Sequence, residues 1–101
     1  SDAEAARLLT SIQQRFLGMQ RGVRGPLPRP VASMDSLWSA PERDSVMRML
    51  AATASGGPDK VRRELDAILA RTRADELIVA GAIHDHAARL RSYELLAGLA
   101  V

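Results

Sequence analysis

The sequence contains no cysteine and no long uninterrupted apolar stretch. Without cysteine the chain has neither a disulfide framework nor a thiolate metal site, which suits the cytoplasm. No stretch approaches the roughly 20 apolar residues needed to span a bilayer, and the N-terminus lacks the basic-then-apolar order of a signal peptide. We therefore expect a soluble, cytoplasmic protein with no membrane partner.

Aromatic residues are also scarce, at 3% of the 101 residues, namely Phe16, Trp38 and Tyr93. Ala, Leu, Val, Ile and Met provide most of the 47% hydrophobic fraction. Ala and Leu lose little side-chain entropy in a helix, so this composition favours helices. The hydrophobic content is high enough to form a core, and charged residues make up only 26% of the chain. Both values argue against disorder of the whole chain.

The chain carries almost no net charge, because its 14 basic residues are nearly balanced by 12 acidic ones. The pI of about 9.9 is high because all basic residues except Lys60 are arginines. No basic block of the kind that binds nucleic acid or membranes is present. We expect no nucleic-acid partner.

The first half, residues 1–50, predicts a helix, a proline-rich loop and a second helix. The first helix covers residues 1–19, and the loop covers residues 20–36 with prolines at alternate positions. The second helix covers residues 41–50, where Ser39 and Glu42 have capping-box spacing. The side chains expected to be buried are Leu8, Leu9, Ile12, Phe16, Leu17, Val46, Met49 and Leu50.

The second half, residues 51–101, predicts the order strand, helix, strand, helix. The strands are Ala51–Ser55 and the apolar run Leu77–Ile83, and the helices cover residues 58–71 and 86–99. An almost unbroken apolar run is typical of a strand buried on both faces of a parallel sheet. Two strands are not stable alone, so this βαβα unit requires neighbours that the 101 residues do not contain.

Gly56 and Gly57 lie between a predicted strand and the start of a helix. Free N–H groups and the helix dipole make such a turn a potential anion or phosphate site. The simpler interpretation is that the glycines allow a tight turn before Pro58. It is favoured because two glycines before a proline match no specific phosphate motif.

The only histidine cluster is His84-Asp85-His86. A metal site would need a third strong ligand, and no further histidine or any cysteine exists, so we expect no metal site here. Asp85 is most simply a helix N-cap. His84, at the end of the predicted second strand, is the better candidate for ligand binding.

No catalytic constellation is present: the chain has no Ser-His-Asp order, no paired catalytic carboxylates and no phosphate-binding loop of the Walker type. We therefore assign no catalytic residue. The chain is too short and too poor in catalytic groups to form a complete enzyme.

Three runs of residues nevertheless carry a resemblance. Gly57–Val61, Ala74–Val79 and above all Asp85–Glu94 resemble the C-terminal end of luciferase-like, flavin-dependent monooxygenases. The upstream runs Gln13–Phe16 and Gly25–Pro28 are similar to the same family.

The resemblance implies a mainly helical chain with one or two short parallel strands, which form the C-terminal βαβα fragment of a (β/α)8 TIM barrel. It also implies reduced FMN as cofactor in the full-length protein, with none expected on this fragment. Gly56, Gly57 and His84 would lie near the flavin pocket. Family members often carry serine where this chain has Gly57, which weakens a capping or phosphate role there.

The expected function is thus the C-terminal portion of a flavin-dependent monooxygenase, inactive alone. Its expected partner is the missing N-terminal part of the barrel or a second copy of the chain, because exposed apolar strand faces favour association. The alternative is a small helical interaction or assembly module without enzymatic activity.

Overall fold

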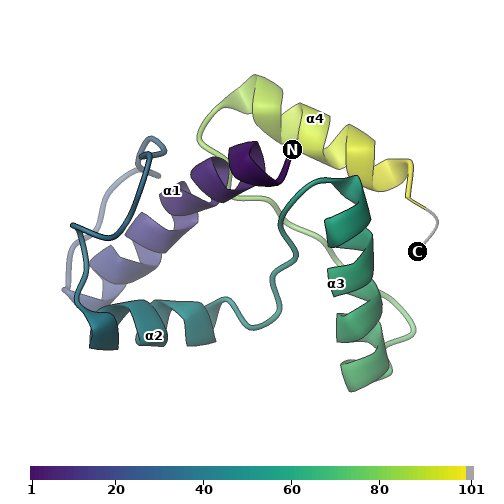
Figure 1. Ribbon diagram of the computed structural model, residues 1–101, viewed down its shortest axis with the longest axis horizontal. Helices are drawn as coiled ribbons and strands as arrows, with labels where there is room; N and C mark the ends of the chain where they lie inside the picture. Colours follow the sequence, from purple (N-terminus) through teal and green to yellow (C-terminus); the bar gives the residue numbers. More distant parts are fainter. Residues whose placement is uncertain (100–101) are drawn as a thin grey trace.

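Four helices provide the regular secondary structure of residues 1–99, the part of the chain that the computed structural model describes (Figure 1). Helix α1 spans Asp2–Gln20 and α2 spans Ala40–Met49. Helix α3 spans Pro58–Thr72 and α4 spans His86–Ala97. The predicted helices are therefore confirmed, with boundaries that differ by one or two residues.

Local capping explains where three of these helices begin. The Ser39 hydroxyl accepts from the Glu42 N–H at 3.3 Å and the Glu42 carboxylate accepts from the Ser39 N–H at 2.9 Å, which completes the capping box of α2. Asp85 caps α4 by accepting from the Ala88 N–H at 2.8 Å. At α1 the Ser1 hydroxyl accepts from the Glu4 N–H at 3.2 Å, and the Glu4 carboxylate forms an ion pair with Arg7.

The predicted proline-rich loop is present between α1 and α2, and polar side chains of α1 hold it in place. The Thr10 hydroxyl accepts from the Val31 N–H at 2.9 Å, and the Gln14 amide donates to the Arg29 carbonyl at 2.8 Å. These bonds satisfy backbone groups of a segment that has no helix or sheet of its own.

The core lies where α1, α2 and this loop meet. Leu17, Met34, Val46 and Leu50 are buried, and Ile12, Phe16, Val31 and Trp38 pack against them. The predicted burial of Met49 is wrong, because its side chain is 44% exposed. Val46 on α2 and Leu50, the residue directly after α2, are the ones buried in this core. The Met49 sulfur instead accepts a hydrogen bond from the Gln20 amide on α1.

An ion pair connects the end of α1 to the first turn of α2. Arg21 follows the last residue of α1, and its guanidinium donates to both carboxylate oxygens of Glu42, at 2.7 and 2.9 Å. The same guanidinium donates to the Leu37 carbonyl at 3.1 Å. This two-pronged pair is the geometry in which an Arg–carboxylate contact is most specific. It ties the end of α1, the loop and the start of α2 together.

The predicted strand Ala51–Ser55 is wrong. Its backbone instead continues the last turn of α2: the Ala51 N–H donates to the Arg48 carbonyl and the Thr53 N–H to the Leu50 carbonyl. The Ser55 N–H is bound by the Glu64 carboxylate at 2.7 Å. With these donors used locally, none of them is left to form a ladder.

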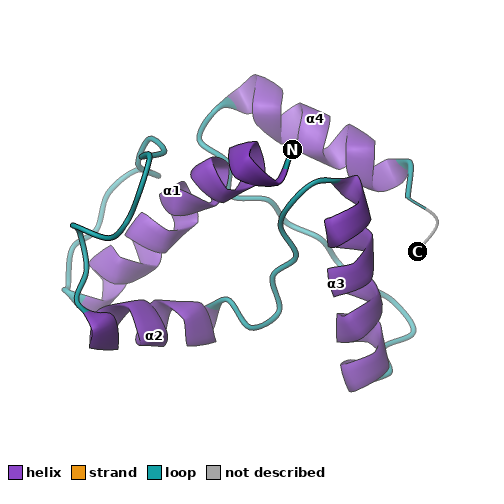
Figure 2. Ribbon diagram, viewed as in Figure 1, coloured by secondary structure: helices purple, strands orange, loops and turns teal. Residues whose placement is uncertain are grey.

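The predicted strand Leu77–Ile83 is wrong as well, and so is the assignment of a βαβα fragment of a TIM barrel. Figure 2 shows helices and loops, with no strand within residues 1–99. The segment runs as an irregular connection from the end of α3 to the start of α4 (Figure 1). A strand exists only when a second strand pairs with it, and the described chain offers no such partner. The apolar run is also exposed rather than buried, with Ile78 fully exposed.

The small core makes a clear prediction for Leu17, which is 5% exposed. Leu17→Ala leaves a cavity at the α1–α2 contact, and we expect a loss of roughly 2–5 kcal/mol in the free energy of unfolding. Chemical denaturation followed by circular dichroism measures this loss. Met19→Ala, at a position 57% exposed on the same helix, is the control and should change stability by less than about 0.5 kcal/mol. Equal losses for the two variants would contradict the described core.

Glu42 predicts a specific dependence of stability on acid. Hydrogen bonds from Arg21, and a further one from the Ser39 N–H, lower the pKa of Glu42 from 4.5 to about 2. Because the folded-state pKa lies below the unfolded one, the pair stabilises the fold fully above pH 4.5. That contribution is lost as pH falls from 4.5 towards 2.

The measurement is the difference in unfolding free energy between the unmodified chain and Glu42→Gln at a series of pH values. We expect the difference to be constant above pH 4.5 and to shrink below it, because glutamine does not titrate. A difference that does not change with pH would show that the carboxylate charge contributes nothing.

Candidate functional site

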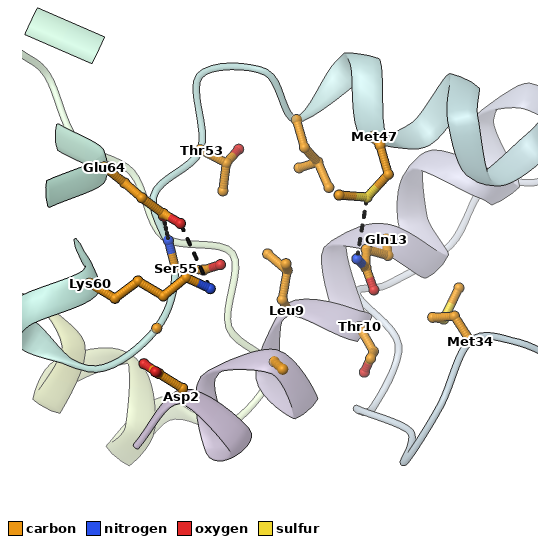
Figure 3. Close-up of a pocket in the computed structure, with 13 residues that line it drawn as sticks. Asp2, Leu9, Thr10, Gln13, Met34, Met47, Thr53, Ser55, Lys60 and Glu64 are labelled. Atoms are coloured by element: carbon orange, nitrogen blue, oxygen red, sulfur yellow. Dashed lines mark hydrogen bonds and ion pairs between the residues drawn. The ribbon is translucent and has the colours of Figure 1, made fainter. Parts of the chain in front are cut away.

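An open cleft of about 420 Å³ is bordered by α1, α2, residues 50–56 and the first turns of α3. Its floor is apolar and one end is polar. The residues that line it are Asp2, Ala6, Leu9, Thr10, Gln13, Met34, Met47, Leu50, Thr53, Ser55, Gly56, Lys60 and Glu64. Figure 3 shows Lys60 and Glu64 of α3 close to Ser55, and Gln13 of α1 facing Met47 of α2.

The Gly56-Gly57 turn forms the polar end of the cleft. Gly56 has φ +136°, a conformation open to glycine, and Gly57 is the N-cap of α3. The N–H of Gly57 donates to the Asp2 carboxylate of α1 at 2.5 Å. At the turn considered as a potential anion site, a carboxylate of the chain itself therefore binds the backbone, at a helix N-terminus where negative charge is stabilised.

A second carboxylate completes this end of the cleft. Glu64 accepts from the Ser55 N–H at 2.7 Å, and its other oxygen lies 3.8 Å from the Lys60 ammonium. Lys60 is the one cation among the described lining residues. The two acidic side chains hold the turn against α1 and α3, so their first role here is structural.

The predicted candidates are separated by the fold. Gly56 lines the cleft and Gly57 lies beside it, whereas His84 is exposed and absent from the cleft lining. His84 lies on the irregular segment before α4 rather than at the end of a strand. Its neighbour His86 has its Nδ1 atom 2.6 Å from the guanidinium of Arg89.

Sequence reasoning missed Asp2, Lys60 and Glu64. The Asp2–Gly57 contact joins positions 55 residues apart, and no local sequence pattern predicts a contact over that separation. Glu64 and Lys60 are four residues apart on one helix, a spacing that does favour an ion pair. What spacing could not reveal is that Glu64 also binds the backbone before the helix.

Residues 1–99 contain no group of three or more histidine or acidic side chains placed to hold a metal ion. Within the same range, no helix has both the length and the apolar character needed to cross a membrane.

Gly56 generates a prediction about the turn. In Gly56→Ala a Cβ atom would lie 2.5 Å from the Lys60 Cδ and 2.9 Å from the Asp2 carboxylate. The φ of +136° is itself strained for alanine, so we expect a loss of about 1–3 kcal/mol in unfolding free energy. Gly25→Ala, where a Cβ meets nothing within 4 Å, is the matched control. A loss no larger than that of the control would contradict the described turn.

Comparison with known proteins places this geometry in context. Two curated proteins named luciferase-like monooxygenase, from Escherichia coli strains K12 and CFT073, are each 45% identical over 95 residues. The protein YvbT of Bacillus subtilis strain 168, described as uncharacterized, is 39% identical over 97 residues. No family model matches the chain. No solved structure matches it either.

The matches cover 94–96% of this chain but only 28–29% of the length of those relatives. The chain therefore spans less than a third of the curated proteins it matches. The resemblance inferred from Gly57–Val61, Ala74–Val79 and Asp85–Glu94 is confirmed as a similarity: almost all of this chain matches a segment of proteins named luciferase-like monooxygenase.

Proposed function

We propose that this chain is the C-terminal portion of a flavin-dependent, luciferase-like monooxygenase, and that it acts only together with the remaining part of a longer chain. The observation that carries the proposal is the 45% identity over 94% of this chain to luciferase-like monooxygenases of which it spans only 28%. Reduced FMN, when bound, supplies the electrons with which such an enzyme activates oxygen.

We further propose that the chain alone binds no flavin. At the Gly56-Gly57 turn, the Asp2 carboxylate already takes the N–H of Gly57. A flavin phosphate would meet a like charge there, so the residues present do not fit that group in this arrangement. His84 lies away from the cleft and adds no donor to it.

The apolar segment, residues 77–83, is the surface on which we expect the remainder of the longer chain to pack. Ile78 is fully exposed, and Leu77 and Val79 are also exposed. Leu77 and Val79 themselves line a mainly apolar groove of about 320 Å³, together with side chains of α3 and α4 such as Leu65, Leu69 and Leu96. Burying one side chain such as Ile78 contributes roughly 1.5–3 kcal/mol, so several together supply a strong driving force.

The occupant we propose is the rest of the protein rather than a second copy. The relatives are longer proteins in which a segment like this one accounts for only 28–29% of the length. A surface left exposed in so short a segment is therefore expected to be covered by the other residues of the same chain.

A chimera tests the proposal. In the luciferase-like monooxygenase of Escherichia coli K12, the matched segment is replaced by this 101-residue chain, and FMN uptake is measured by flavin absorbance and by binding titration. We expect the chimera to fold and to bind FMN, and the isolated chain to bind none. The 45% identity over the matched residues makes the exchange feasible.

Two variants sharpen the test. Ile78→Asp in the chimera should abolish or strongly reduce FMN binding, because it buries an unpaired charge at the covered surface. Val23→Asp is the matched control, since Val23 is an exposed apolar residue in the loop after α1. A chimera that folds without binding flavin, while the isolated chain associates with itself, would overturn the proposal in favour of a helical assembly module.

A further inference from the structure

Two methionines on α2 face two glutamines on α1. The Gln13 amide nitrogen lies 3.7 Å from the Met47 sulfur, and the Gln20 amide nitrogen lies 3.5 Å from the Met49 sulfur (Figure 3 shows the first pair). Gln13 and Gln20 are about two helical turns apart, so they share one face of α1. A thioether is a weak acceptor, so these amides are placed on groups that use them poorly.

The methionines differ sharply in access to solvent. Met47 and Met49 are 47% and 44% exposed, whereas Met34 in the core is 4% exposed. Met19 is 57% exposed, and within residues 1–99 no side-chain amide donates to its sulfur. Met47 and Met49 are thus exposed methionines with a side-chain amide partner. Met19 is exposed without such a partner among residues 1–99, and Met34 is buried.

We propose that Met47 and Met49 form a reversible oxidation site, in which Gln13 and Gln20 hold the oxidised side chains. Hydrogen peroxide is the oxidant. A sulfur lone pair attacks one peroxide oxygen, the S–O bond forms as the O–O bond breaks, and a proton shift releases water. Sulfur loses two electrons and peroxide gains them. Methionine sulfoxide reductases reverse the change with thiol electrons.

The amide partners decide what oxidation does to the structure. A sulfoxide oxygen is a much stronger acceptor than a thioether sulfur, so the existing Gln–Met contacts become ordinary hydrogen bonds between α1 and α2. Met47 also lines the cleft, so its oxidation places a polar acceptor on the apolar floor. Oxidation at Met19 instead adds a polar group that has no such partner.

The experiment uses the 101-residue chain with Met19→Leu, which leaves Met47 and Met49 as the exposed sulfurs. After treatment with limiting hydrogen peroxide, peptide mapping by mass spectrometry locates the sulfoxides and thermal unfolding reports the Tm. We expect oxidation of Met47 and Met49 well ahead of Met34, with the Tm unchanged or raised. Adding Gln13→Ala and Gln20→Ala should convert this into a fall of about 4 °C or more on oxidation.

Side-chain amide signals in NMR spectra provide a second measurement that needs no glutamine variant. On oxidation of the Met19→Leu chain, the signals of Gln13 and Gln20 should shift while that of Gln14 stays in place. In a Met47→Leu, Met49→Leu chain, oxidation at Met19 should shift none of the three. The proposal is overturned if the glutamine signals do not move, if the Tm change is the same with and without the glutamines, or if Met34 oxidises as fast as Met47.

Discussion

The contact of Arg21 with Glu42 is the constraint on which most of this structure depends. One carboxylate closes the capping box of α2 through Ser39 and at the same time receives the guanidinium that follows α1. Exposed ion pairs contribute little energy individually, and this one acts mainly by fixing geometry. It joins the end of α1 to the start of α2 across a long loop, beside the core in which Leu17 and Val46 are buried.

The cleft follows from the same arrangement. With α2 against α1, the short segment after α2 reaches the start of α3, where Asp2 and Glu64 bind its backbone N–H groups. Asp2 binds the N–H of Gly57 and Glu64 binds the N–H of Ser55, so carboxylates of the chain itself occupy this polar end of the cleft. In the apolar segment, residues 77–83, the side chains of Leu77, Ile78 and Val79 are exposed. The described residues thus leave apolar surface exposed, whereas carboxylates already lie at the position where an external anion could bind.

This exposed apolar surface agrees with the relatives, which contain a segment of this kind within much longer proteins. Helices α1 and α2 share a core, but α3 and α4 meet across a groove rather than through a packed interface. Small folds bury a limited fraction of their surface, and this one leaves large side chains such as Ile78 and Leu90 exposed. The second half of the chain is therefore packed less completely than the pair of helices α1 and α2.

The sequence by itself determined the four helices and the family resemblance. Their starts depend on residues within one turn of each other, such as Ser39 with Glu42 and Asp85 with the amide of Ala88, so short spacings suffice to predict them. The state of residues 77–83 was decided only by the tertiary structure. An apolar run indicates burial in a sheet, but a strand needs a partner from elsewhere in the chain, and the described residues contain none. The pairing of Asp2 with Gly57 was likewise invisible in the sequence, because it joins distant positions through the packing of the elements between them.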